Sequence, residues 1–150
     1  MKMYARLGIA MVLSLTVMFF LSFTQTRTWD HVHLNLSNFY ISLTMIGSMG
    51  LIMLLVMWPM YENKRLNLGL LGIFVLVLVG GFALARTETF VGDREFLSSM
   101  IPHHSRAILV CQEADLSDPE IIELCEQIIS TQRDEITQME EIIDRLEDAD

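Results

Sequence analysis

The sequence predicts an all-α protein in which three transmembrane helices precede an antiparallel helical hairpin. Of its 150 residues, 52% are hydrophobic, and they gather in three long apolar runs before residue 86. Residues 86–150 instead hold 17 of the 19 acidic residues, with apolar residues at helical spacing. A short polar turn divides this acidic part, so its two helices should be antiparallel neighbours. We expect a membrane domain over 1–85 and a helical domain over 86–150.

The predicted spans cover about residues 7–24, 36–58 and 66–85, each long enough to cross a bilayer. The first could be a signal peptide, but no small-residue cleavage site follows it, so we expect a retained span. Most basic residues of the membrane part lie on one side of the spans: Lys2, Arg6, Lys64 and Arg65 against Arg27. The positive-inside rule then places the N-terminus in the cytoplasm and residues 86–150 outside it. In a bacterium this means the inner membrane and the periplasm.

Methionine recurs every four residues in the second span, at Met45, Met49, Met53 and Met57. A row of thioethers is suited to Cu(I), but methionine also packs well against helices and lipid, which is its commoner role. The loop before this span contains His31 and His33, which the predicted topology puts on the same side as the acidic domain. They are candidate accessory metal ligands, although loop histidines usually have no special role.

The acidic domain should form helices over residues 93–115 and 118–148. Ser117 with Glu120 fits a capping box for the second helix, and Asp118 with Pro119 fits an alternative cap. Pro102 should kink the first helix, and the kink either marks a boundary between two helical pieces or turns His103 inward. A core line follows steps of four and three along the second helix, through Ile121, Cys125, Ile128, Gln132, Glu135, Met139, Ile142 and Leu146.

Gln132 and Glu135 interrupt this core line with polar groups. A carboxylate there costs several kcal/mol of desolvation unless it is paired or coordinated. A turn centred near residue 117 brings polar residues of the first helix opposite them. In this register Met100 faces Glu135, His104 faces Thr131 and Gln132, Phe96 faces Met139, and Cys111 lies near Cys125.

Imidazole, thioether and carboxylate groups at one place indicate a metal site. Its predicted ligands are His103 and His104, with Met100, Gln132, Glu135 and Met139 as partners. Methionine with histidine favours copper, whereas histidine with glutamate would also accept zinc or iron. The alternative is a polar cluster without metal, in which His104 bonds Glu135 or Gln132. Cys111 and Cys125 form a disulfide, or are two small core residues, or are soft ligands at the edge of the site.

Other function classes find little support in the sequence. There is no nucleophile–base set and no glycine-rich phosphate loop before a helix, so we do not expect an enzyme. The strong negative charge of residues 86–150 disfavours nucleic-acid binding.

The stretch Met-Ile-Pro-His-His at residues 100–104, followed by Gln132, Glu135 and Met139, resembles a known bacterial family. This is the "domain of unknown function three hundred and five" family of the ferritin-like superfamily. The membrane half, with Trp29-Asp30-His31 and the segment 61–65, resembles its membrane-anchored branch. The resemblance implies an extracytoplasmic helical domain with His103 and His104 as motif histidines, and a role in copper or heavy-metal handling.

Members of this family often carry two hairpins that make a four-helix bundle. This chain has one hairpin with a wide apolar face, so we expect a homodimer that completes such a bundle. The sequence thus predicts a membrane-anchored periplasmic metal-binding protein that serves copper handling or metal resistance beside a transporter or resistance partner. The rival interpretation is an assembly module for a membrane partner, with a structural polar cluster and no metal.

Overall fold

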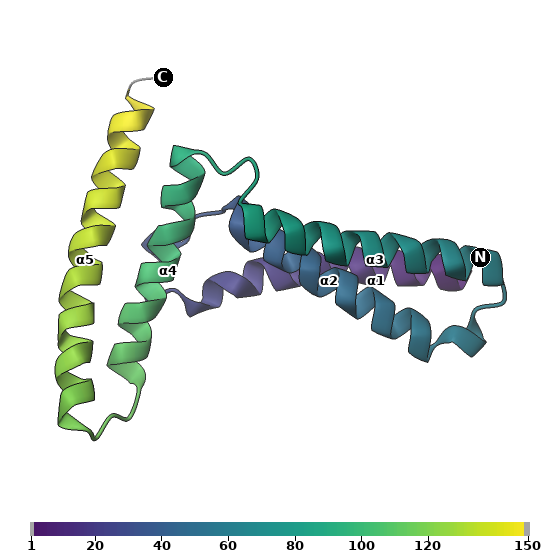
Figure 1. The fold of residues 1–150 in the computed structure, drawn as a ribbon, viewed down its shortest axis with the longest axis horizontal. Helices are drawn as coiled ribbons and strands as arrows, with labels where there is room; N and C mark the ends of the chain where they lie inside the picture. The colour runs from purple at the N-terminus through teal and green to yellow at the C-terminus, as the bar shows by residue number, and fades with distance from the viewer. Residues whose placement is uncertain (1, 149–150) are drawn as a thin grey trace. The chain divides into compact units, whose positions relative to one another are not determined.

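The computed structural model describes residues 2–148, which form five α-helices, three short 3-10 helices and no strand (Figure 1). The all-helical prediction is therefore confirmed for this part of the chain. The helices belong to two compact units. The first unit holds the chain up to Ser22 with Ser37–Phe90, and the second holds Phe23–Leu36 with the chain from Val91 onward.

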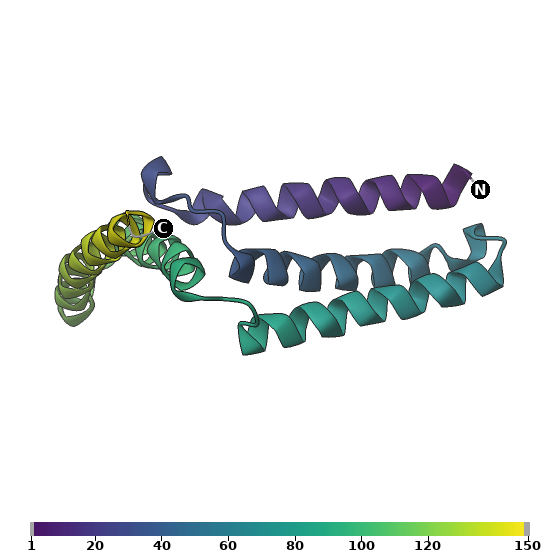
Figure 2. The ribbon, with the colours of Figure 1, turned by 90° about the horizontal axis from the view of Figure 1, so that it is seen from above.

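The first unit contains α1 (Lys2–Leu21), α2 (Leu36–Val56) and α3 (Lys64–Thr87). All three helices are long and apolar enough to cross a membrane, as the sequence predicts. Figure 2 shows them with their long axes aligned. The helix α2 ends two residues before the predicted end because Pro59 disfavours helical geometry in the preceding residue. Trp58–Met60 instead forms a 3-10 turn.

Two kinds of contact hold the first unit together. Glycines let α2 and α3 approach closely, because a Cβ atom on Gly47 would lie 2.6 Å from the backbone nitrogen of Leu78. A polar cluster ties α1 to α3, where the Tyr4 hydroxyl donates to Asn67 Oδ1 at 2.8 Å. Asn67 is fully buried, and its amide donates to the Tyr61 carbonyl at 3.3 Å.

The second unit is built on α4 (Asp93–Glu113) and α5 (Pro119–Glu147), which lie side by side and run in opposite directions (Figure 1). The Asp118 side chain caps α5 by accepting from the backbone N–H groups of Glu120 and Ile121. Of the two predicted caps, the structure therefore has Asp118 with Pro119. The helix α4 continues through Pro102, so the alternative of two helical pieces is wrong.

Apolar side chains from both helices form the core of the second unit. The buried members are Leu97, Ile101, Ile108, Ile136 and Met139, and Met100, Ile129, Ile142, Ile143 and Leu146 pack against them. Ile121 is exposed although the predicted core line includes it. The reason is that α4 ends at Glu113 and leaves no helix opposite the first turn of α5. Phe96, which the predicted register places opposite Met139, is also exposed.

Candidate metal centre

A histidine of α4 and a glutamate of α5 meet between the two helices. His104 Nε2 lies 2.9 Å from Glu135 Oε2. The Gln132 amide donates to the same carboxylate oxygen at 3.1 Å. The His104 side chain is only 13% exposed, whereas that of Glu135 is 44% exposed. Both polar residues that interrupt the apolar face of α5 thus take part in one hydrogen-bonded group with His104.

The hydrogen bonds of His104 determine where its protons lie. His104 Nδ1 is 2.8 Å from the backbone carbonyl oxygen of Met100. A carbonyl oxygen only accepts, so Nδ1 carries a hydrogen. An unprotonated Nε2 and a carboxylate both accept, and they would repel each other at 2.9 Å. A hydrogen must therefore lie between Nε2 and Glu135, carried either by the imidazole or by the carboxyl group.

The predicted register holds at Cys111 and Cys125, whose Cα atoms are 5.3 Å apart. Because both helices rise by the same amount per residue, this register keeps His104 level with Gln132. His104 nevertheless reaches Glu135, about three residues further along α5, because helical side chains lean toward the N-terminus of their own helix and these two therefore lean toward each other.

The other predicted ligands lie around this group in different surroundings. Met100 holds His104 through its carbonyl, while its side chain packs against the core. Met139 is buried in that core. His103 is exposed, and its ring meets that of His104 edge to face with centroids 5.9 Å apart. The structure therefore brings His104, Gln132 and Glu135 into direct contact and leaves His103 on the outside of α4.

Within residues 2–148, no group of three or more His, Cys, Asp or Glu side chains is gathered closely enough to hold a metal ion. The contact between His104 and Glu135 supplies two such donors. Any further donors would be the neighbouring thioether, amide or imidazole groups.

The loop between α1 and α2 packs along α4, a contact that the sequence does not indicate. The Arg27 backbone N–H donates to Ser105 Oγ at 2.8 Å, and the Arg27 side chain donates to Gln112 at 2.8 Å. At the start of α2, the Leu36 N–H donates to Glu95 at 3.1 Å. The loop therefore belongs to the same compact unit as α4 and α5.

Pro102 helps to explain how the loop is held. Proline has no N–H, so the Ser98 carbonyl loses its normal partner within α4. The buried Asn35 of the loop donates its side-chain amide to this carbonyl at 3.4 Å. A proline inside a predicted helix indicates that the carbonyl four residues before it is free to accept a hydrogen bond. The sequence does not show which group donates that bond.

Both loop histidines reach the second unit. His31 Nδ1 lies 2.8 Å from Ser105 Oγ, and Ser105 is fully buried beside His104 in the sequence. His33 is half-buried, and this burial lowers its pKa. The negative charge of Glu140 raises that pKa and the nearby His31 lowers it, both by less than the effect of burial. The structure therefore places His31 against Ser105, separate from the contact between His104 and Glu135.

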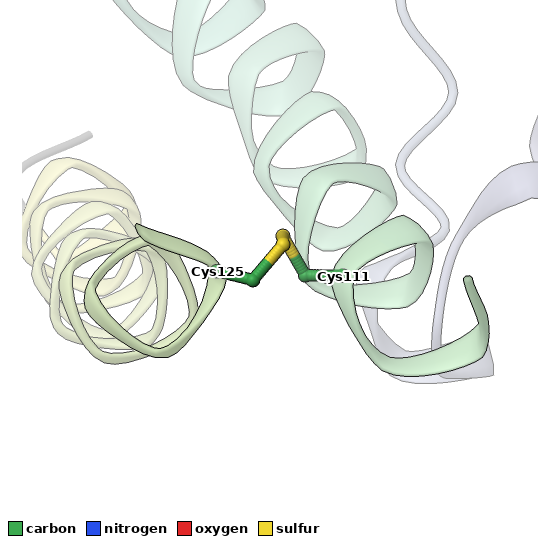
Figure 3. The surroundings of a disulfide bond; sticks show 2 residues. All are labelled: Cys111 and Cys125. Carbon is green, nitrogen blue, oxygen red and sulfur yellow. A yellow bond between two sulfur atoms is a disulfide. The ribbon is translucent and has the colours of Figure 1, made fainter. Parts of the chain in front are cut away.

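A disulfide joins Cys111 of α4 to Cys125 of α5 (Figure 3). The Cα atoms are 5.3 Å apart, and 14 residues separate the two cysteines in the sequence. The bond cross-links the last turns of α4 to the first turns of α5. With both sulfur atoms bonded to each other, neither is a free thiol or a thiolate ligand in this state.

An uncovered group of apolar side chains lies near the same end of the helix pair. We call it the apolar patch. Its members are Val110 of α4 and Ile121, Ile122 and Leu124 of α5, which are 55%, 48%, 40% and 54% exposed. Exposed large apolar residues that adjoin one another can mark interaction sites.

Comparisons with known proteins show which family the chain resembles. Residues 82–143, which include α4 and most of α5, match the family described as "Domain of unknown function (DUF305)". The chain is also 32% identical to the uncharacterized protein L153 of Acanthamoeba polyphaga mimivirus over 115 residues, which are 75% of this chain and 74% of that protein. No solved structure matches the chain. The two similarities together show that the chain belongs to the DUF305 family.

Proposed function

We propose that this protein is a membrane-anchored metal-binding protein for copper handling or heavy-metal resistance, with His104 and Glu135 at the centre of its site. One observation carries the proposal. His104 Nε2 and Glu135 Oε2 lie 2.9 Å apart between two helices and require a shared cation, which is a proton when no metal is present. A transition metal would take the place of that proton, so its binding should release a proton.

The surrounding groups favour such an exchange. Metal-bound histidines nearly always donate their other ring N–H to a carbonyl or carboxylate, as His104 Nδ1 does to Met100. A tetrahedral ion about 2.1 Å from each donor holds the donors about 3.4 Å apart. The pair would need to open by about 0.5 Å, which the half-exposed Glu135 side chain allows.

The donor types support copper over other metals. Imidazole with carboxylate also suits zinc or iron, but a thioether adds a preference for copper. Met100 lies one helical turn from His104 and is the nearest candidate, with Met139 in the core below. Gln132 already bonds Glu135 and is placed to orient the carboxylate. His103 lies on the exposed side of α4, from which it would add a further ligand to the ion. The chemistry of this set is binding and delivery, without a catalytic step.

The disulfide and the distribution of basic residues support a location outside the cytoplasm. Disulfides persist in oxidising compartments such as the bacterial periplasm. We therefore assign the protein to a bacterial inner membrane, with a cytoplasmic N-terminus and the second unit in the periplasm. A metal transporter or resistance protein in the same membrane would be its partner.

Metal titration of the full-length protein in detergent tests the proposal directly. Cu(I), Cu(II) and Zn(II) are compared for the unmodified protein and for His104→Ala, Glu135→Gln and His103→Ala. We expect copper to bind selectively at this site, so that His104→Ala loses one bound copper per chain and Glu135→Gln weakens the binding of that ion. His103→Ala makes the same chemical change at an exposed position and should weaken binding less. Copper affinity that stays unchanged in His104→Ala, with the helical content retained, would contradict the assignment.

A second candidate function is assembly, and the apolar patch favours it. In this alternative the patch covers the same patch of a second chain, which completes a four-helix bundle as a homodimer. The polar contact between His104 and Glu135 would then fix the register of the helices, as buried polar pairs do in some coiled coils. Because both partners are strongly acidic, the dimer should be stronger at high salt, where their repulsion is screened.

The mass of the detergent-solubilised protein, measured by light scattering, separates these functions. We expect the double variant Ile121→Ser/Leu124→Ser to lose the dimer, whereas Phe96→Ser, which removes an exposed apolar side chain elsewhere, keeps it. A dimer that forms equally well with and without metal, in a protein that binds no metal, would favour the assembly function. A patch variant with an unchanged mass would exclude the patch as the interface.

A further inference from the structure

The methionines of this chain are distributed unevenly. Nine of the 11 lie within residues 1–60, and α3 contains none. The sequence shows one row of them, on α2. The structure shows that methionines of α1 contribute to the same place.

Six methionines lie along one apolar core of the first unit, and we call them the thioether cluster. Met11 is buried, and the other five pack around the same core: Met3, Met18, Met49, Met53 and Met57. Three of the six come from α1 and three from α2 or its end. Met45 and Met60 are different, because both are about half-exposed.

The helical geometry spaces these sulfur-bearing residues along the unit. Steps of four residues on α2 correspond to a rise of about 6 Å, so Met49, Met53 and Met57 cover about 12 Å. Aromatic contacts fix the level of α1 at both ends. Phe19 meets Phe39 with ring centroids 6.2 Å apart, and Tyr4 meets Tyr61 at 5.0 Å. Met11 therefore lies level with the middle of α2.

Packing alone does not explain this choice of residue. The helix α3 contributes to the same core with Leu70, Leu71, Phe74 and Val77, none of which is methionine. Leucine and methionine are nearly interchangeable in volume. The core could therefore be filled without thioethers, as α3 shows.

We propose that the thioether cluster between α1 and α2 is a second metal site, which takes a soft monovalent ion of the Cu(I) class. Thioethers are neutral soft donors that select Cu(I). An empty cluster buries no charge and packs as an ordinary apolar core, so the site carries no desolvation penalty before the ion arrives. This site is separate from His104 and Glu135, and it does not depend on the function proposed for them.

The test uses Ag(I), a soft ion that needs no reductant and so leaves the disulfide between Cys111 and Cys125 intact. It is titrated into the full-length protein in detergent, in a His104→Ala background that removes the other proposed site. Met49→Leu/Met53→Leu changes the cluster, and Met45→Leu/Met60→Leu is the matched control at exposed positions. We expect the cluster variant to lose one bound Ag(I) per chain and the control to retain it.

Two further measurements test the proposal even if Met49→Leu/Met53→Leu folds poorly. Met11→Leu/Met49→Leu removes one thioether from each helix and should also lose the ion. X-ray absorption at the silver edge of the His104→Ala protein should show a sulfur shell. Equal Ag(I) binding by the cluster variants and the control, or a spectrum without sulfur neighbours, would overturn the proposal.

Discussion

At the scale of single residues, two adjacent histidines differ in their hydrogen-bond partners and in their exposure. His104 lies between α4 and α5 with a carbonyl at Nδ1 and a carboxylate at Nε2. His103 is exposed, and the two rings share only an edge contact. The sequence gives these residues equal weight as ligands. Their positions on the helix, about 100° apart, give one of them a cation-binding partner and leave the other at the surface.

The pH dependence of stability should depend on His33. Burial lowers the pKa of His33 below its ordinary value of 6.5, so the folded protein binds fewer protons there than the unfolded chain does. The free energy of unfolding should therefore fall as the pH drops through and below 6.5, and it should be independent of His33 at higher pH.

Denaturant unfolding over a range of pH measures this effect. His33→Gln should flatten the slope between neutral and acidic pH. His103→Gln, the same change at an exposed position, is the matched control. A slope that is unaffected by His33→Gln would show that the docking of the loop does not depend on a neutral imidazole.

At the scale of the elements, the start of α5 depends on a single cap. Asp118 accepts from two backbone N–H groups, whereas Ser117 caps nothing in this helix. Asp118→Ala should therefore lower the free energy of unfolding by about 1 kcal/mol. Ser117→Ala should change it little. Chemical denaturation of both variants checks the difference, and an equal loss in the two would show that the cap is shared.

The disulfide between Cys111 and Cys125 joins α4 to α5. Closing a loop of this length should contribute about 3 kcal/mol to the free energy of unfolding. Cys111→Ser/Cys125→Ser should lose that stability, and a reductant should destabilise the unmodified protein to a similar extent. Thermal unfolding with and without reductant measures both effects. The double variant should not respond to reductant, and a response would point to a different cause.

At the scale of the whole molecule, the helices are the part that the sequence predicts well. The ends of α2, α3, α4 and α5 agree with the predicted segments to within about two residues, because apolar runs, proline and capping residues are local signals. The pairing of His104 with Glu135, in contrast, depends on the direction and reach of two long side chains. A register of facing positions cannot decide whether His104 bonds Glu135 or Gln132.

The docking of the first loop could not be predicted for a related reason. Arg27, His31 and Asn35 lie 63 to 78 residues from their partners on α4. The acceptors are a buried hydroxyl and a carbonyl that Pro102 leaves free, and neither forms a pattern in the sequence. Contacts of this kind become visible only when the tertiary structure places the two segments together.

The central claim is that a metal ion replaces the proton shared by His104 and Glu135. The most direct measurement is an anomalous difference map from crystals of the full-length protein grown with copper. We predict a peak about 2 Å from both His104 Nε2 and Glu135 Oε2, with the two atoms further apart than their present 2.9 Å. A map without a peak there, and with the hydrogen bond between the two side chains intact, would contradict the account.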